Sequence, residues 1–242
     1  MAIRCENCPL NTKALFVHLT ADELRDMQRF KVGELTIDPG TPLLMEGSNS
    51  PQLFTALRGL GLRYKTLPNG RRQVLNFVFP GDFIGLQAGV MGEMKHSVEA
   101  TTHMTLCVFD RSELWNLFKI KPERGFDLTW LAAVEEHFMG EAVATIGQRT
   151  ALEAVAWALL RVFRRGQTLD LVRNFSMALP FRQQDLADSL GLSLVHTNKT
   201  LGKLRDRQVA SWTDGTLQVN DLKALADIAQ DTLENLPKRP LI

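Results

Sequence analysis

The spacing of hydrophobic positions changes along this chain, and the first pattern predicts a domain rich in strands. Between residues 34 and 109, short β-prone runs alternate with turn residues such as Pro39-Gly40 and Asn69-Gly70. The predicted strands cover residues 35–37, 42–45, 53–57, 61–67, 73–78, 97–101 and 105–109. Many short strands at this spacing are typical of an antiparallel barrel or jelly roll.

A long helical pattern follows Pro122, which suits the first turn of a helix because its missing N–H is not needed there. The helix should continue to about Gln148, which is roughly 40 Å at 1.5 Å per residue. One set of positions alternates steps of four and three residues, and this spacing is a heptad seam. The seam consists of Phe126, Trp130, Ala133, His137, Gly140, Ala144 and Gly147. It predicts packing against the same helix of a second copy, and the alternative is a helix buried within one large domain.

Two further amphipathic helices are predicted, one before and one after residues 182–207. One carries an apolar stripe over residues 152–163 and is closed by Arg164-Arg165-Gly166, after a hinge at residues 148–150. The other begins after Asn220 or Asp221 and has Leu222, Leu225, Ile228 and Leu233 as its core face. Pro237 and Pro240 predict a frayed end. Near the start of the chain, Thr20 and Glu23 form a capping box for a helix to about Phe30.

Residues 182–207 read as two short helices joined by a tight turn. Gly191 ends the first helix in the left-handed conformation, and Ser193 is the N-cap of the second. The inner faces are apolar or small, with Leu186, Ala187, Leu190, Thr197, Thr200, Leu201 and Leu204. This pattern predicts a helix-turn-helix, whose second helix enters the DNA major groove. The alternative is an ordinary pair of helices with a solvated polar face.

Two neighbouring features favour the DNA-binding interpretation. An Asp214-Gly215 turn between two apolar alternations predicts a β-hairpin directly after the second helix, and this order is that of a winged helix. The end of the second helix is basic. The predicted DNA-contacting residues are Gln183, Ser193, Val195, His196, Asn198, Lys199, Lys203 and Arg205. Among them Lys199 is the best candidate for guanine and Val195 for a thymine methyl group.

Composition adds few constraints. A chain of 242 residues with 45% apolar and 23% charged residues is ordinary for a globular protein with one large or two modest domains. No apolar run approaches the ~20 residues needed to span a bilayer, and the first residues lack the apolar core of a signal peptide. We therefore expect a cytoplasmic protein without a membrane partner. We find no nucleophile–base pair, glycine-rich phosphate loop or metal-hydrolase motif in the sequence, and it therefore gives no indication of an enzyme.

In the order of these elements the chain resembles the Crp/Fnr family of bacterial transcription regulators, from Cys5 to about Ala229. The resemblance implies an α+β fold with a cyclic-nucleotide-binding-like β-roll, a long dimerisation helix and a C-terminal winged helix-turn-helix domain. The expected domains are residues 1–121, 122–149 and 150–242. The resemblance also implies a homodimer on double-stranded DNA with an inverted-repeat operator, and RNA polymerase as a partner by analogy.

The nucleotide site of the family is altered in this chain. Family members that bind cyclic AMP need a carboxylate soon after the Gly85 position and an Arg-Ser pair for the cyclic phosphate. Here these positions are Leu86 and His96-Ser97. Because leucine accepts no hydrogen bond and neutral histidine is a poor phosphate ligand, the sequence argues against cyclic AMP. Gly89, Met91, Gly92, Glu93 and Met94 are expected to form a loop between strands.

The three cysteines of the chain are candidate ligands for a metal site. Cys5 and Cys8 form a C-x-x-C pair, which recurs at zinc and iron–sulfur sites. The oxygen-sensing branch of the family holds an iron–sulfur cluster with an N-terminal group of cysteines and one distant cysteine. By resemblance Cys107 is the distant one, but Ala14 stands where a further ligand would be. We favour the alternative, in which Cys5 and Cys8 are free thiols in a mobile segment and Cys107 is a buried small hydrophobe.

These features predict a sequence-specific DNA-binding transcription regulator. The rival hypothesis from another class is a redox or small-molecule sensor whose main output is not DNA binding. The sequence names neither the effector nor the operator.

Overall fold

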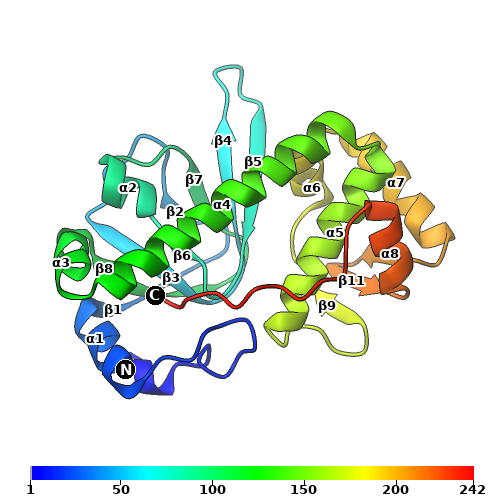
Figure 1. Ribbon diagram of the computed structural model, residues 1–242. Coiled ribbons are helices and arrows are strands. Elements are labelled where there is room, and N and C mark those ends of the chain that lie inside the picture. The colour runs from blue at the N-terminus through cyan, green and yellow to red at the C-terminus, as the bar shows by residue number, and fades with distance from the viewer. Residues whose placement is uncertain (1) are drawn as a thin grey trace. The chain divides into compact units, whose positions relative to one another are not determined.

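The computed structural model describes residues 2–242 and has the predicted α+β architecture (Figure 1). The chain divides into two compact units. The first unit contains the chain up to Thr66, then Leu75–Glu136 and Lys238–Ile242, and the second contains Leu67–Val74 and His137–Pro237. The domain boundaries expected at residues 121 and 149 come from sequence pattern alone and stay a prediction.

Two four-stranded antiparallel sheets form the β-roll of the first unit. Their strand orders are β1-β8-β3-β6 and β2-β7-β4-β5. The strands are β1 Lys31–Ile37, β2 Pro42–Leu44, β3 Gln52–Arg58, β4 Gly61–Thr66, β5 Arg72–Val78, β6 Phe83–Ile84, β7 Ser97–Ala100 and β8 Met104–Asp110. Buried apolar side chains from both sheets, including Phe54, Val98 and Leu106, fill the space between them. The predicted strands are confirmed, and β6 is an additional short strand that the apolar pattern did not indicate.

The prediction of a simple loop between the nucleotide-site positions and β7 is wrong in its first half. Gly89 and Met91 lie in a short helix, α2 (Leu86–Met91), which ends at Gly92. The sequence did not indicate α2, because the segment is short and contains a glycine, which has low helix propensity. The packing explains Gly89: a Cβ atom there would lie 2.9 Å from a side-chain carbon of Leu114.

The helices α1 and α4 follow the sequence prediction closely, and α4 begins in the first unit and ends in the second. The capping box of Thr20 and Glu23 begins α1 (Ala21–Phe30). A 3-10 turn, η2 (Arg111–Glu113), leads into α3 (Leu114–Ile120), and the long helix α4 (Pro122–Gln148) has the predicted bounds. A second core joins α1, α3 and α4 to the strands, with Met27, Phe30, Phe109, Leu117, Leu128 and Leu131.

The expectation of a frayed end near Pro240 is wrong, because residues 238–242 complete the first unit. The backbone of Arg239 exchanges hydrogen bonds with Leu15 and Val17, at 2.8 and 3.0 Å. The Arg239 guanidinium pairs with the Asp82 carboxylate at 3.2 Å, and both side chains are buried. Ile242 lies in the second core. Spacing could not reveal this, since its partners are distant in the sequence.

The second unit is the helical part with a small three-stranded sheet of order β10-β11-β9. Its elements are α5 Ala151–Thr168, β9 Ser176–Ala178, α6 Gln183–Leu190, α7 Leu194–Asp206, β10 Ala210–Thr213, β11 Thr216–Val219 and α8 Leu222–Ala229. In the part of the chain that the structure describes, none of the helices combines the length and apolar character needed to cross a membrane.

The break between α4 and α5 falls within residues 148–150, where the hinge is predicted, and Thr150 caps α5 in a capping box with Glu153. Two other details of the second unit differ from the sequence prediction. Gly166, expected to close that helix, lies inside it, where an added Cβ atom would be 2.6 Å from the sulfur of Met177. Leu233 lies outside α8, because the left-handed backbone of Gln230 (φ 51°) ends that helix.

Candidate DNA interface and sensor sites

Helices α6 and α7 meet at a tight turn. Gly191 ends α6 with a φ of 66°, which glycine adopts without the penalty of a Cβ atom. The hydroxyl of Ser193 then accepts a hydrogen bond from the backbone N–H of His196 at 3.2 Å and so caps α7. The predicted inner faces are confirmed, since Leu186, Ala187, Leu190, Thr197, Thr200, Leu201 and Leu204 are all buried.

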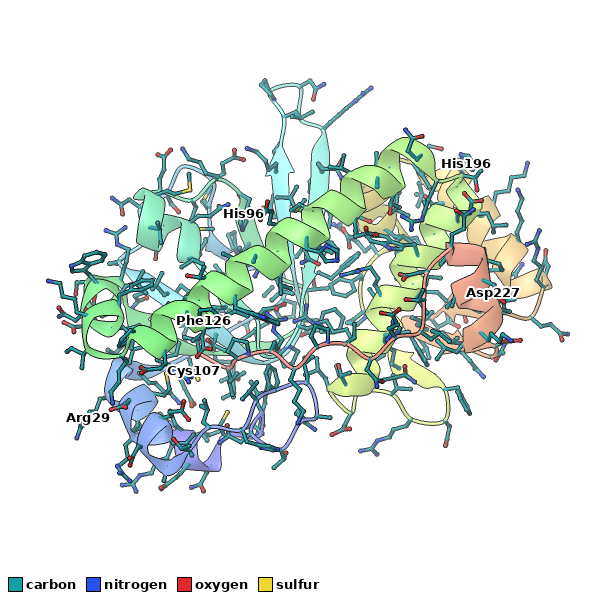
Figure 2. All side chains as sticks on the ribbon, in the orientation of Figure 1. Arg29, His96, Cys107, Phe126, His196 and Asp227 are labelled. Carbon is teal, nitrogen blue, oxygen red and sulfur yellow. The ribbon has the colours of Figure 1, made fainter. Side chains whose placement is uncertain are left out.

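The outer face of α7 carries most of the predicted DNA-contacting side chains. Ser193, Val195, His196, Asn198, Lys199, Lys203 and Arg205 are exposed, and Gln183, at the start of α6, is partly buried. Figure 2 shows His196 on the outer side of α7. Val195 is 80% exposed. A large apolar side chain on a solvated polar face is not stabilised by contact with water. Its shape and polarity suit contact with a thymine methyl group.

The predicted wing is present after α7. Strands β10 and β11 pair in antiparallel register, with Thr213 opposite Thr216. The two turn residues, Asp214 and Gly215, have φ of 49° and 70°, as a two-residue hairpin requires. Trp212 anchors the wing through a hydrogen bond from its indole N–H to the carbonyl of Leu179 at 3.1 Å. The turn itself is exposed and carries small polar residues.

The predicted heptad seam of α4 is largely uncovered within this chain. Phe126 is 71% exposed, and Figure 2 shows it on α4. Ala133, His137, Gly140, Ala144 and Gly147 are exposed, whereas Trp130 is partly buried. A Cβ atom added at Gly140 or Gly147 would meet nothing within 4 Å. Packing within one copy therefore does not explain these glycines.

The interior of the β-roll holds a network of its own polar side chains. The buried Arg63 guanidinium pairs with the Glu135 carboxylate of α4 at 3.0 Å and donates a hydrogen bond to the carbonyl of Phe83 at 3.0 Å. The Asn76 amide also donates to Glu135, at 3.3 Å. The hydroxyl of Ser97 accepts the backbone N–H of Glu46 at 3.0 Å.

All three cysteines line one pocket of the first unit, together with Lys31 and Ile242. Burial raises the pKa of the Cys5 and Cys8 thiols, and it raises the pKa of Cys107 to about 11. Burial therefore disfavours the thiolate, which is the nucleophilic form of cysteine.

Comparison with known proteins decides the family. The cyclic nucleotide-binding domain matches residues 34–121, and the Crp-like helix-turn-helix domain matches residues 153–228. The nitrogen fixation regulation protein FixK of Bradyrhizobium diazoefficiens is 28% identical over 217 residues, which is 90% of each chain. The chain belongs to the Crp/Fnr family of transcription regulators. The transcriptional activator protein FnrL of Cereibacter sphaeroides is 25% identical and covers 94% of this chain and 92% of its own.

A solved structure agrees with this assignment to the Crp/Fnr family. FixK2 of Bradyrhizobium japonicum superimposes with a TM-score of 0.74 at 25% identity, covering 84% of this chain and 98% of its own. The matched relatives are transcription regulators and not enzymes. The helix-turn-helix is thus that of a DNA-binding Crp/Fnr regulator, and the predicted fold class is confirmed.

Two positions of the Crp/Fnr nucleotide site have specific roles in this chain. Leu86 is the first residue of α2 and packs against the second core. The pKa of His96 is lowered to about 4, because burial disfavours the imidazolium and the Arg63 guanidinium adds repulsion. His96 is therefore neutral at physiological pH, and neither side chain offers the charge that a cyclic phosphate requires.

This pKa predicts an acid-sensitive contribution to stability. The folded pKa of His96 lies below the unfolded value near 6.5, so its contribution is complete above pH 6.5 and is lost as the pH falls toward 4. The full loss amounts to at most about 3 kcal/mol. We expect the unfolding free energy of the wild type to fall more steeply than that of His96→Gln between pH 6.5 and 4 in guanidinium titrations. Parallel pH profiles would assign the acid sensitivity to other groups.

The residues around the cysteines, as arranged, do not fit the iron–sulfur cluster found in one branch of the Crp/Fnr family. Within residues 2–242, no group of three or more His, Cys, Asp or Glu side chains is placed to hold a metal ion. Ala14 offers no ligand atom. The metal role of Cys5, Cys8 and Cys107 stays a prediction.

The alternative for these cysteines also needs correction. Cys5 begins a 3-10 turn, η1 (Cys5–Asn7), and its N–H donates to the Gln28 side chain at 2.9 Å. Cys107 is only partly buried, with its side chain in the same pocket as Cys5 and Cys8. The segment around Cys5 is therefore ordered rather than mobile, whereas all three cysteines are free thiols and Cys107 packs against the second core, as that alternative expects.

Sequence reasoning missed the polar network around Arg63. A signal existed, because an arginine in the apolar strand run of residues 61–64 must either disrupt the core or find a partner there. The partner, Glu135, could not be named, since it lies on a helix 72 positions later by residue number.

Proposed function

We propose that this regulator acts as a homodimer that places α7 of each copy in the major groove of an inverted-repeat operator. The observation that carries the proposal is the outer face of α7, where Val195, His196, Asn198 and Lys199 are exposed side by side. Two-fold symmetry would set the half-sites about one helical turn (~34 Å) apart.

The side chains of α7 and of the start of α6 would divide into two groups. Lys199 would donate to guanine O6 and N7, and Val195 would contact a thymine methyl group. His196 and Asn198 would hydrogen-bond base edges or phosphates. Gln183, Ser193, Lys203 and Arg205 would contact phosphates, which fixes the position of the helix without reading sequence.

The uncovered seam of α4 supports the dimer. Phe126 of the seam is 71% exposed, and Val143 and Ile146, which lie beside the seam on the same helix, are 67% and 47% exposed. Exposure of a stripe of apolar residues to water is unfavourable. A second copy of the same helix would cover this stripe. Gly140 and Gly147 would let the two backbones approach closely.

Binding to genomic DNA fragments, followed by footprinting, tests the proposal. We expect saturable, salt-sensitive binding to an inverted repeat, with much weaker binding to random DNA of the same length. A protein that binds no fragment, or binds all fragments equally at physiological salt, would exclude it. The rival sensor hypothesis gains support if DNA binding fails while a small molecule or oxidant changes the tryptophan fluorescence.

Lys199→Ala is expected to weaken binding to the operator about tenfold and to relax the preference at one base pair, because one bidentate base contact is worth about 1–3 kcal/mol. Lys223→Ala, an exposed lysine at the start of α8, is the control for the loss of one positive charge. Competition with operators mutated at each position measures the preference. An equal loss on operator and random DNA would instead make Lys199 a phosphate contact.

We also propose RNA polymerase as a protein partner and the cytoplasm as the location. Both rest on analogy with the Crp/Fnr family of transcription regulators, to which the chain belongs.

A further inference from the structure

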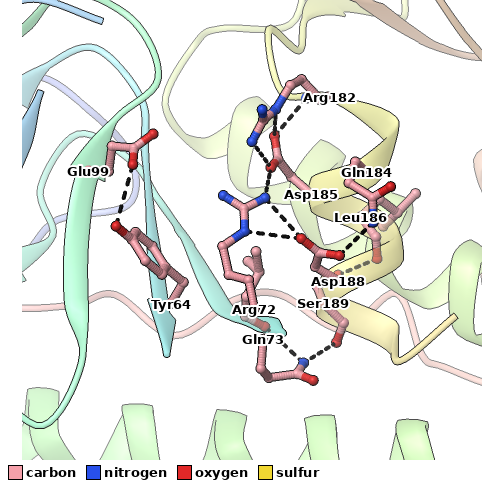
Figure 3. Close-up of polar contacts among 11 residues, drawn as sticks. Tyr64, Arg72, Gln73, Glu99, Arg182, Gln184, Asp185, Leu186, Asp188 and Ser189 are labelled. Atoms are coloured by element: carbon pink, nitrogen blue, oxygen red, sulfur yellow. Dashed lines mark hydrogen bonds and ion pairs between the residues drawn. The ribbon is translucent and has the colours of Figure 1, made fainter. Parts of the chain in front are cut away.

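An arginine on the edge strand β5 contacts the first helix of the helix-turn-helix. Residues 67–74, which include the start of β5, belong to the second unit. The Arg72 guanidinium donates to the Asp188 carboxylate from Nε at 3.0 Å, and its terminal nitrogen pairs with Asp185. The adjacent Gln73 side chain donates to the backbone carbonyl of Ser189 at 3.2 Å. Figure 3 shows these contacts along α6.

The contacted positions of α6 share one face. Asp185, Asp188 and Ser189 are at i, i+3 and i+4, a spacing that aligns side chains on a helix. The fork of a guanidinium can meet two carboxylates at once, which a lysine ammonium cannot do with the same geometry. Arg72 therefore connects two turns of α6 and balances two negative charges.

This ion pair is largely shielded from water. The side chains of Arg72, Asp185 and Asp188 are 19%, 2% and 16% exposed. Removing one partner of a buried pair leaves the other charge without compensation, and this is costlier than losing a surface pair. Without Arg72, Asp185 would keep the Arg182 guanidinium, which donates to it at 2.9 Å, whereas Asp188 would keep the neutral amide of Gln184.

The hydrogen bonds also fix the start of α6. Asp185 accepts the backbone N–H of Arg182 at 2.9 Å and so closes the capping box of this helix. Burial acts to raise the pKa of Asp185, but hydrogen bonds from Arg182 and Arg72 outweigh it, and the pKa is lowered. Asp185 therefore remains ionised at neutral pH and needs a positive partner.

The orientation of α6 determines that of the recognition helix α7. The two helices pack together, Leu186, Leu190 and Leu201 on them are buried, and the turn at Gly191 leaves little freedom between them. Without Arg72, the carboxylate of Asp188 on α6 would also lack a positive partner and would repel the phosphates that the start of this helix is proposed to meet. Both effects act in the same direction, toward weaker DNA binding.

We propose that Arg72 is a positioning residue for DNA binding, which neutralises Asp185 and Asp188 and holds α6 in place beneath the recognition helix. The proposal rests on the proposed insertion of α7 into the major groove. It assigns Arg72 no contact with DNA.

The test compares Arg72→Ala with Arg71→Ala, which removes the same charge from the neighbouring exposed arginine. Affinity for the operator is measured by fluorescence anisotropy at several salt concentrations, with circular dichroism as the check on folding. We expect Arg72→Ala to weaken binding about tenfold and Arg71→Ala less than about twofold. Where the alanine variant does not fold, Arg72→Gln carries the same test.

Two readouts separate positioning from other roles. The double variant Arg72→Ala, Asp188→Asn should bind the operator at least about threefold more tightly than Arg72→Ala alone, because the second substitution removes the uncompensated carboxylate. The slope of log affinity against log salt should match the wild type, whereas the loss of a phosphate contact lowers that slope by about 0.9.

Each remaining outcome is decisive. If the wild type binds no DNA, the proposed function fails as well. If the wild type binds and Arg72→Ala equals Arg71→Ala, binds more tightly than the wild type, or is not rescued by Asp188→Asn, only the role of Arg72 is overturned.

Discussion

Gly140→Arg is expected to convert the protein from a dimer to a monomer and to weaken operator binding at least about 100-fold. The structure shows open space around this position in α4, so the substitution does not disturb the fold of one copy. Replacing glycine within a helix even raises helix propensity by about 1 kcal/mol. Across the proposed seam, however, two arginines would face each other where the backbones approach. Loss of the dimer removes the gain from binding two half-sites at once.

Gly140→Ala is the matched control, because it gains the same helix propensity but adds only a methyl group. Light scattering at micromolar concentration gives the mass of each variant, and anisotropy gives the affinity. Dimeric Gly140→Arg with the affinity of the wild type would place the interface elsewhere.

Arg239→Ala is expected to lower the unfolding free energy by about 3–5 kcal/mol, which is the range for removing one partner of a buried ion pair. The Asp82 side chain is 1% exposed and would lose the guanidinium that faces it at 3.2 Å. Asp82 also accepts the backbone N–H of Phe79 at 2.8 Å, so it cannot turn outward without breaking that turn.

Lys238→Ala provides the comparison, since Lys238 carries the same charge but is exposed. Guanidinium unfolding followed by tryptophan fluorescence measures both variants. A loss from Arg239→Ala no larger than that from Lys238→Ala would mean that the Arg239–Asp82 ion pair adds no more stability than an exposed charge.

Local patterns predicted the elements that are stabilised locally. The strands of the β-roll, the bounds of α4 and the Asp214-Gly215 turn follow from alternation, proline position and turn chemistry. The two faces of α7 also followed, because buried and exposed positions of a helix are set by its own period. In each case the information lies within a few residues of the feature.

The features that sequence missed depend on pairs that are distant in the chain. Arg72 and Asp185 are 113 positions apart, and Thr55 donates to the Ile242 oxygen across 187 positions. A charged residue in a strand indicates that a partner is needed, but only the folded chain identifies it. The membership of Cys107 in a pocket with Cys5 and Cys8 could be suggested only by family resemblance, since no spacing rule connects them.

The docking of residues 238–242 has a consequence for how the protein is made. A ribosome synthesises the entire DNA-binding unit before it reaches Arg239 and Ile242, so the Arg239–Asp82 ion pair can form only near the end of translation. Domains usually fold in the order in which they emerge. Here most of the first unit emerges first but residues 238–242 emerge last, so a nascent chain that stalls within the winged helix lacks the residues that complete this unit.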